Sequence, residues 1–117
     1  MTITLYGIPN CGTVKRARAW LAERGVAYVF HDFKREGLPP ARLDAWIAAL
    51  GWEALVNRQG LTWRRLAEAE RRRVVDAASA RAALRAQPSL VKRPVVEWAD
   101  GGIGVGFDEA HWAVRTG

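Results

Sequence analysis

The stretch that decides the fold is Thr2-Ile-Thr-Leu-Tyr-Gly-Ile-Pro-Asn-Cys-Gly-Thr-Val14, because the spacing of its apolar residues changes partway along it. Residues 2–6 alternate polar and apolar side chains, which is the period of a half-buried strand. Residues 7–12 are rich in turn formers and interrupt this period. Beyond them, apolar residues recur at the spacing of one helix face: Val14, Ala17 and Leu21. The sequence therefore predicts a strand, a loop that contains Cys11, and a helix.

Outward from this stretch, the first helix is expected to end at Gly25, because glycine is favoured just past a helix C-terminus. Residues 26–30, Val-Ala-Tyr-Val-Phe, predict a second and more fully apolar strand. A strand, a helix and a strand at this spacing indicate a βαβ unit, whose two strands run parallel with a right-handed crossover.

A helical segment is expected next. Pro39 and Pro40 suit the first turn of a helix. Its apolar face and its closing glycine follow in order: Leu43, Trp46, Ile47, Leu50 and Gly51. Asp76 is the expected N-cap of another helix, which runs to about Ala86. Between these two helices, residues 52–75 are expected to form short helical turns.

The C-terminal part predicts a β-hairpin followed by a last helix. Residues 95–98 and 103–107 have the pattern of two strands joined by a tight turn at Asp100-Gly101. Asp108 is expected to cap a short final helix that carries Trp112. A βαβ unit and a ββα unit with a helical segment between them form the layout of a thioredoxin-like fold, in the α/β class with a mixed sheet.

Length and composition limit the classes of protein to which this chain can belong. At 117 residues, with 50% hydrophobic and 26% charged residues, the chain suits a single globular domain over residues 1–117. No apolar run reaches the roughly 20 residues that span a bilayer. The N-terminus lacks the basic head and long apolar stretch of a signal peptide. We therefore expect a cytoplasmic protein with no membrane partner.

The single cysteine excludes an internal disulfide and a multi-cysteine metal cluster. His31 and His111 show no ligand spacing, so no metal site is expected. The net charge of +6 favours anionic partners such as oxyanions, glutathione, acidic proteins or nucleic acid, unless it reflects only solvated arginines. Nucleic-acid binding is the weaker expectation, because tryptophans such as Trp46 and Trp98 fall on apolar faces.

Cys11 is the candidate for chemistry. It follows a predicted strand and precedes the first turn of a helix, where unpaired backbone N–H groups and the positive end of the helix dipole stabilise a thiolate. Such a position lowers the pKa of a cysteine and makes it a better nucleophile near neutral pH. The alternative is an inert core cysteine, but the polar loop Pro9-Asn-Cys-Gly-Thr is a poor place for a buried apolar residue.

Two other segments have weaker local signals. Pro94 stands immediately before a predicted strand and is a candidate for a cis peptide bond, with Lys92 and Arg93 preceding it. Taken alone, this segment is more typical of an ordinary edge-strand proline beside two solvated charges. Arg58 lies in a polar loop, where an arginine is usually solvated.

Three segments together carry a resemblance: Tyr6-Gly-Ile-Pro-Asn-Cys-Gly-Thr, Leu55-Val-Asn-Arg and Pro88-Ser-Leu-Val-Lys-Arg-Pro-Val-Val. With their spacing over nearly the whole chain, they resemble the arsenate reductase (ArsC)/Spx family. The match is closest to its YffB-type ArsC-like branch, which Gly106-Phe107 also fits. The resemblance implies that the chain is a glutathione-dependent monothiol reductase, which uses Cys11 to reduce a disulfide or a small oxyanion.

The same resemblance implies roles for individual residues. Cys11 is the catalytic cysteine, Arg58 and Arg93 surround a bound anion, and Pro94 is a cis-proline beside the cysteine. Lys92 is expected to add a further cation to the site. The active-site loop is expected to supply its geometry and N–H donors through Asn10, Gly12 and Thr13. No tightly bound cofactor is implied. Glutathione is the expected co-substrate, and glutaredoxin is a further expected partner.

Three departures from the family pattern bear on the substrate. Arsenate reductases of this kind carry an arginine, a histidine and a serine where this chain has Gly106, Gly7 and Val14. Each departure removes a donor or a charge, which predicts weak arsenate reduction but leaves thiol exchange with glutathione. Spx-type regulators often carry a C-x-x-C switch, which Val14 excludes here. An unswitched role in binding RNA polymerase is the alternative function.

Overall fold

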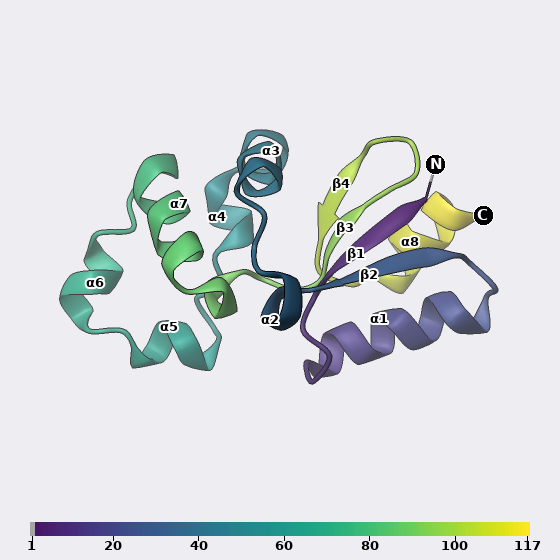
Figure 1. Ribbon diagram of the computed structural model, residues 1–117, viewed down its shortest axis with the longest axis horizontal. Coiled ribbons are helices and arrows are strands. Elements are labelled where there is room, and N and C mark those ends of the chain that lie inside the picture. Colours follow the sequence, from purple (N-terminus) through teal and green to yellow (C-terminus); the bar gives the residue numbers. More distant parts are fainter. Residues whose placement is uncertain (1) are drawn as a thin grey trace. The chain divides into compact units, whose positions relative to one another are not determined.

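Strand β1 (Ile3–Gly7) lies inside a four-stranded sheet in the computed structural model, which describes residues 2–117. On one side β1 pairs in parallel with β2 (Tyr28–Asp32), and on the other it pairs antiparallel with β3 (Val95–Glu97). Strand β4 (Ile103–Val105) adds to β3 in the antiparallel sense, which gives the order β2-β1-β3-β4 (Figure 1). The sheet is therefore mixed, as the sequence predicted.

Helix α1 (Gly12–Glu23) joins the two parallel strands, and the residues after it explain where β2 begins. The Gly25 N–H donates to the Ala22 carbonyl, and the Val26 N–H donates to the Leu21 carbonyl. This pair of bonds is a Schellman motif, and Gly25 occupies it with a positive φ of 68°. Because Val26 is still held by the helix end, the second strand covers residues 28–32 and not the predicted 26–30.

The C-terminal hairpin is confirmed, but its turn is larger than predicted. The Trp98 N–H donates to the Gly102 carbonyl, so three residues form the loop in place of a two-residue Asp-Gly turn. Gly101 takes a φ of 93°, the left-handed conformation that closes such loops. Helix α8 (Glu109–Thr116) follows, and the Asp108 carboxylate accepts the Ala110 and His111 N–H groups as its N-cap.

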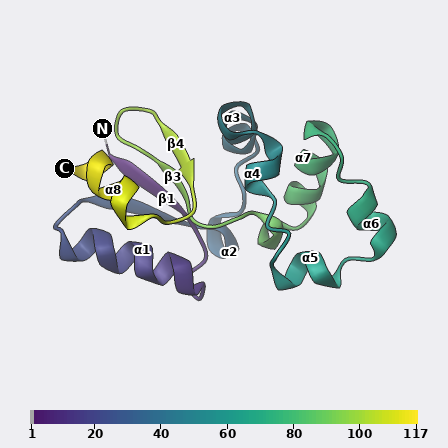
Figure 2. The ribbon, with the colours of Figure 1, turned by 180° about the vertical axis from the view of Figure 1, so that it is seen from behind.

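Helices α1 and α8 cover the same face of the sheet (Figures 1 and 2). The side chains between them form a continuous buried cluster: Ile3, Leu5, Ala17, Trp20, Leu21, Val96, Trp98 and Trp112. The Trp112 ring meets those of Trp20 and Trp98 edge to face, at centroid distances of 6.1 and 5.1 Å. Edge-to-face packing of this kind adds about 0.5–1.5 kcal/mol per pair beyond area burial. Trp98 is thus a core residue, as its place on an apolar face predicted, and Trp20 and Trp112 share that core.

Residues 37–92 are largely helical. They form α3 (Pro40–Leu50), α4 (Trp52–Leu55), α5 (Leu61–Arg65), α6 (Glu68–Arg72), α7 (Ala77–Ala86) and a 3-10 turn, η1 (Pro88–Leu90). Gly51 ends α3 and Asp76 caps α7 through the Ser79 N–H, both as predicted. An antiparallel β-bridge pairs Val56, which follows α4, with Val91, which follows η1.

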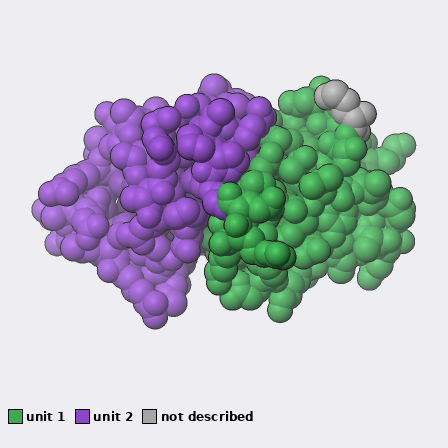
Figure 3. All heavy atoms as spheres, viewed as in Figure 1, with its two compact units in different colours: residues 1–36, 93–117 green, residues 37–92 purple. Residues whose placement is uncertain are grey.

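The chain divides into two compact units (Figure 3). Unit 1 contains the sheet with α1, α8 and the short helix α2 (Phe33–Glu36), and it covers residues 1–36 and 93–117. Unit 2 is the helical segment, residues 37–92. That both belong to one domain stays a prediction. The fold class is confirmed as α/β and thioredoxin-like, with a helical segment inserted between a βαβ unit and a ββα unit.

Candidate functional site

Cys11 is the N-cap residue of α1. Its own N–H donates to the Ile8 carbonyl at 3.4 Å, which closes a turn at the end of β1. Its carbonyl accepts the Lys15 N–H at 2.9 Å and so begins the helix. The backbone of Cys11 is extended, with φ −92° and ψ 125°, as an N-cap requires. The thiol therefore stands at the helix end that the sequence predicted, and Cys11 is only partly buried.

The tight junction between β1 and α1 depends on Gly7. A Cβ at this position would lie 2.8 Å from Val14 Cγ2, closer than real contacts allow. Val14 itself is fully buried beneath the loop. Gly7 and Val14 thus pack together in an apolar contact, at two positions where the family pattern expects polar side chains.

The pKa of the Cys11 thiol is lowered by its surroundings. Burial raises this pKa, but the Val14 N–H, the Arg93 guanidinium and the Thr13 N–H all favour the thiolate and outweigh burial. Cys11 makes no capping hydrogen bond of normal geometry, so the two amides act on the sulfur mainly through their dipoles. The net effect is a cysteine that ionises more readily than an ordinary thiol.

The sheet register brings Arg93 to Cys11. Val95 pairs with Tyr6 in the antiparallel ladder, so the residues before Val95 run past the end of β1, where the cysteine loop begins. The Arg93–Pro94 peptide bond is cis, as expected for Pro94. The Pro94 carbonyl accepts the Gly106 N–H at 2.8 Å, which ties this segment to the end of β4.

Arg58 and Lys92 lie together in a pocket of unit 2. The Val56–Val91 bridge and the bond from the Asn57 N–H to the Leu90 carbonyl, at 2.8 Å, bring their two segments side by side. The pocket has a volume of about 200 Å³ and these lining residues: Val56, Asn57, Arg58, Gln59 and Lys92. The Arg58 guanidinium lies over the Trp52 ring, 5.4 Å from its centroid. The pocket lining carries two cations and no carboxylate, which suits an anionic group.

The loop donors differ in part from those predicted. The two amides that lower the pKa of Cys11 belong to Val14 and Thr13. Thr13 is among the predicted loop donors, and Val14 is not. The rule that an N-cap side chain faces the N–H groups two and three residues on would have identified Val14. Asn10 is exposed in the turn, and Gly12 is the first residue of α1.

Among residues 2–117, no cluster of three or more His, Cys, Asp or Glu side chains is arranged to hold a metal ion. None of the helices in this range is long and apolar enough to cross a membrane.

Comparison with known proteins gives consistent matches over nearly the whole chain. The model of the ArsC family matches residues 6–114. An uncharacterized protein of Haemophilus influenzae is 38% identical over 110 residues, which is 94% of this chain and 95% of the relative. The solved structure of a YFFB protein is 44% identical, has a TM-score of 0.93 and covers 99% of this chain and 100% of its own. That of an arsenate reductase (ArsC) related protein from Brucella melitensis is 50% identical, with a TM-score of 0.77 and coverage of 99% and 95%.

Proposed function

The chain belongs to the ArsC family, and on that premise we propose that it is a glutathione-dependent monothiol reductase acting through Cys11. Solved relatives include a protein described as related to arsenate reductase, which supports redox chemistry at the level of the family. The observation that carries the proposal is the position of Cys11. Cys11 is the N-cap residue of α1, its thiol lies beside Arg93, and the pKa of that thiol is lowered.

The proposed reaction with a disulfide has two steps. The Cys11 thiolate attacks one sulfur of the substrate disulfide, so a new S–S bond forms and the other sulfur leaves as a thiolate that takes a proton. A glutathione thiolate then attacks the mixed disulfide on Cys11, which restores the Cys11 thiolate and carries the oxidised sulfur away. Because the chain has one cysteine, the second thiol must come from glutathione, or a glutaredoxin must resolve the adduct.

Arg93, Arg58 and Lys92 are proposed to bind anionic groups of the substrate. The Arg93 guanidinium stabilises the thiolate, and the other two form the cationic pocket of unit 2. With an oxyanion, Cys11 and glutathione would supply one thiol each, giving a disulfide, water and an oxyanion reduced by two electrons.

Arsenate is expected to be a poor substrate. Gly106 has a φ of 83°, so an arginine there would be strained, and Gly7 and Val14 fill the places of two polar residues with an apolar contact. A hydrogen bond to a charged group contributes about 1.5–3 kcal/mol, so the absence of several such groups lowers oxyanion turnover by orders of magnitude.

Intact-mass spectrometry during exposure to oxidised glutathione tests the proposal. The reduced protein should gain one glutathione several-fold faster than a model peptide thiol at about pH 7, because more of Cys11 is ionised. The adduct should be absent in Cys11→Ser and should be removed by glutaredoxin.

A rate no higher than that of the peptide would contradict the reductase. Recovery of RNA polymerase subunits from lysate by both wild type and Cys11→Ser would then support the alternative, a regulator that binds RNA polymerase without catalysis.

A further inference from the structure

A groove of unit 1 runs beside the loop that holds Cys11. It has a volume of about 570 Å³, within the range of small-molecule sites, and is open to solvent. Its lining comes from the cysteine loop, α1, β2 and α2: Pro9, Arg18, Phe30, Asp32, Arg35 and Glu36. Pro9 stands two positions before Cys11, so the groove borders the turn that presents the thiol.

Two guanidinium groups in this groove keep donors for a ligand. The Arg18 guanidinium stacks over the Phe30 ring at 4.1 Å, and its Nε donates to the Tyr28 hydroxyl at 3.1 Å. These contacts fix its plane and use one of its five N–H donors. Arg35 is exposed, and within residues 2–117 its side chain makes no hydrogen bond or ion pair. Both groups suit carboxylates, which match the guanidinium fork.

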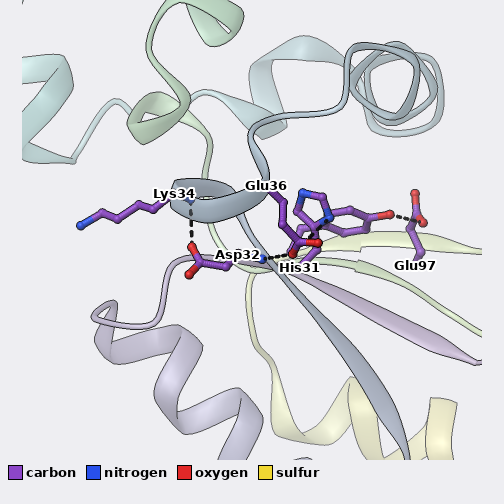
Figure 4. Close-up of polar contacts among 6 residues, drawn as sticks. His31, Asp32, Lys34, Glu36 and Glu97 are labelled. Atoms are coloured by element: carbon purple, nitrogen blue, oxygen red, sulfur yellow. Dashed lines mark hydrogen bonds and ion pairs between the residues drawn. The ribbon is translucent and has the colours of Figure 1, made fainter.

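Two carboxylates line the same groove, those of Asp32 and Glu36. Asp32 is 8% exposed, and its Oδ1 accepts the Lys34 N–H at 2.9 Å. The Glu36 carboxylate is already engaged, because its Oε2 accepts the Asp32 N–H at 3.1 Å and lies 3.9 Å from His31 Nδ1. In Figure 4 the Asp32 carboxylate points away from His31, whereas that of Glu36 lies beside the His31 ring. A buried carboxylate with one hydrogen bond favours a cationic partner.

We propose that this groove binds a short peptide thiol that carries one ammonium and two carboxylates, with the ammonium at Asp32 and the carboxylates at Arg18 and Arg35. Arg18, Arg35 and Asp32 carry charges opposite to those of such a ligand, and Phe30 and Pro9 offer apolar contact to its backbone and methylenes. The second carboxylate of the lining, Glu36, is held by the Asp32 N–H beside His31. The pocket of Arg58 and Lys92 differs, because its lining has no carboxylate to select for an ammonium.

The inference deepens the proposed function and rests on it for the identity of the ligand, since Pro9 of the cysteine loop is part of the groove lining. It concerns non-covalent binding only. Its test therefore uses S-methylglutathione, a thioether that cannot exchange with Cys11 but keeps the ammonium and both carboxylates.

Titration of the ¹⁵N-labelled full chain with S-methylglutathione should shift the amide signals of the groove residues. Arg18→Gln and Arg35→Gln should each weaken binding about tenfold, because each removes a charge-assisted bond to a carboxylate. Arg24→Gln is the matched control. Arg24 follows the same helix but stacks on Trp20, outside the groove, so its substitution should leave the affinity unchanged.

Asp32→Asn gives the sharper test, because the amide oxygen can still accept the Lys34 N–H while the charge is lost. Wild type should bind S-methylglutathione about tenfold more tightly than its N-acetylated form, which lacks the ammonium. Asp32→Asn should bind the two alike. A wild type that does not distinguish the two probes would overturn the assignment of Asp32.

The two proposals fail in different ways. Absence of groove shifts with S-methylglutathione, while Cys11 still gains glutathione rapidly, would overturn the groove and leave the reductase. Groove binding that is sensitive to Arg18 and Arg35, with Cys11 no faster than a peptide thiol, would support the groove and overturn the reductase.

Discussion

Arg93 influences Cys11 as a charge and as a hydrogen-bond donor. Both effects favour the thiolate over the thiol, and together with the Val14 and Thr13 amides they outweigh the burial of the sulfur. The reactivity of Cys11 therefore depends on a residue far away in the sequence, which the β1–β3 pairing delivers.

Replacement of Arg93 by Ala should raise the pKa of Cys11. The folded pKa of the wild type lies below the ordinary value, so its alkylation rate should reach half-maximum at a lower pH than that of a free cysteine. Loss of the neighbouring cation should move this midpoint to higher pH, which slows alkylation several-fold near neutral pH.

The measurement is the rate of iodoacetamide alkylation from about pH 5 to about pH 10, a range that covers both ordinary and lowered thiol pKa values. Arg24→Ala, beside Trp20, serves as control and should keep the wild-type profile. An Arg93→Ala profile that coincides with wild type would count against its role.

Among the secondary-structure elements, the approach of β1 to α1 sets the position of the cysteine loop. The two elements meet at Gly7, which has no side chain and so leaves room for the buried side chain of Val14. This contact replaces polar groups that the family pattern expects, so the region below the loop is apolar in this chain. The groups that stabilise the thiolate are therefore backbone amides and the Arg93 guanidinium.

Gly7→Ala should destabilise the protein by about 1–3 kcal/mol, because the new Cβ overlaps Val14 Cγ2 and a packed interior cannot absorb it. Val14→Ala alone should also destabilise, through the cavity it leaves. In the double variant the two changes relieve each other, so its loss should be smaller than the sum of the single losses. Urea unfolding of all four proteins gives the coupling energy, and strict additivity would contradict the contact.

At the scale of the whole molecule, charge sets how fast anionic substrates arrive. The chain has 18 Lys and Arg against 12 Asp and Glu, a net charge of +6. Such an excess attracts anions over distances that depend on salt, because the Debye length falls from about 30 Å at 0.01 M to about 3 Å at 1 M.

Glutathionylation of Cys11 by oxidised glutathione, an anion, should therefore slow by about tenfold between low and high salt. Bis(2-hydroxyethyl) disulfide is neutral and should react at a rate that salt hardly changes. Stopped-flow measurement of both reactions over the same salt series separates electrostatic attraction of the charged disulfide from any effect of salt on the reactivity of the thiol. Equal salt dependence for the two disulfides would show that net charge does not guide the substrate.

Local patterns in the sequence were sufficient for most elements. Alternation and helical spacing predicted the four strands of unit 1 and its helices α1 and α8, but not the short helix α2. Gly25, Gly51, Asp76 and Asp108 predicted where helices end or begin. These signals worked because each depends on the conformational preference of a few neighbouring residues. They missed the start of β2 and the size of the hairpin loop, because backbone hydrogen bonds at Val26 and Trp98 decided those boundaries.

The sequence by itself determined the fold class and the place of Cys11 at the start of a helix. Through the resemblance, it also indicated that Arg93 and a cis Pro94 belong near the cysteine. Only the tertiary structure decided what surrounds the thiol: the register that brings Arg93 to it, the apolar contact of Gly7 with Val14, and the groove lined by Arg18, Asp32 and Arg35. Helix ends and strand periods are local properties of the chain. The pKa of a thiol and the charge pattern of a groove depend on groups that separate elements bring together, and no local pattern encodes their distances.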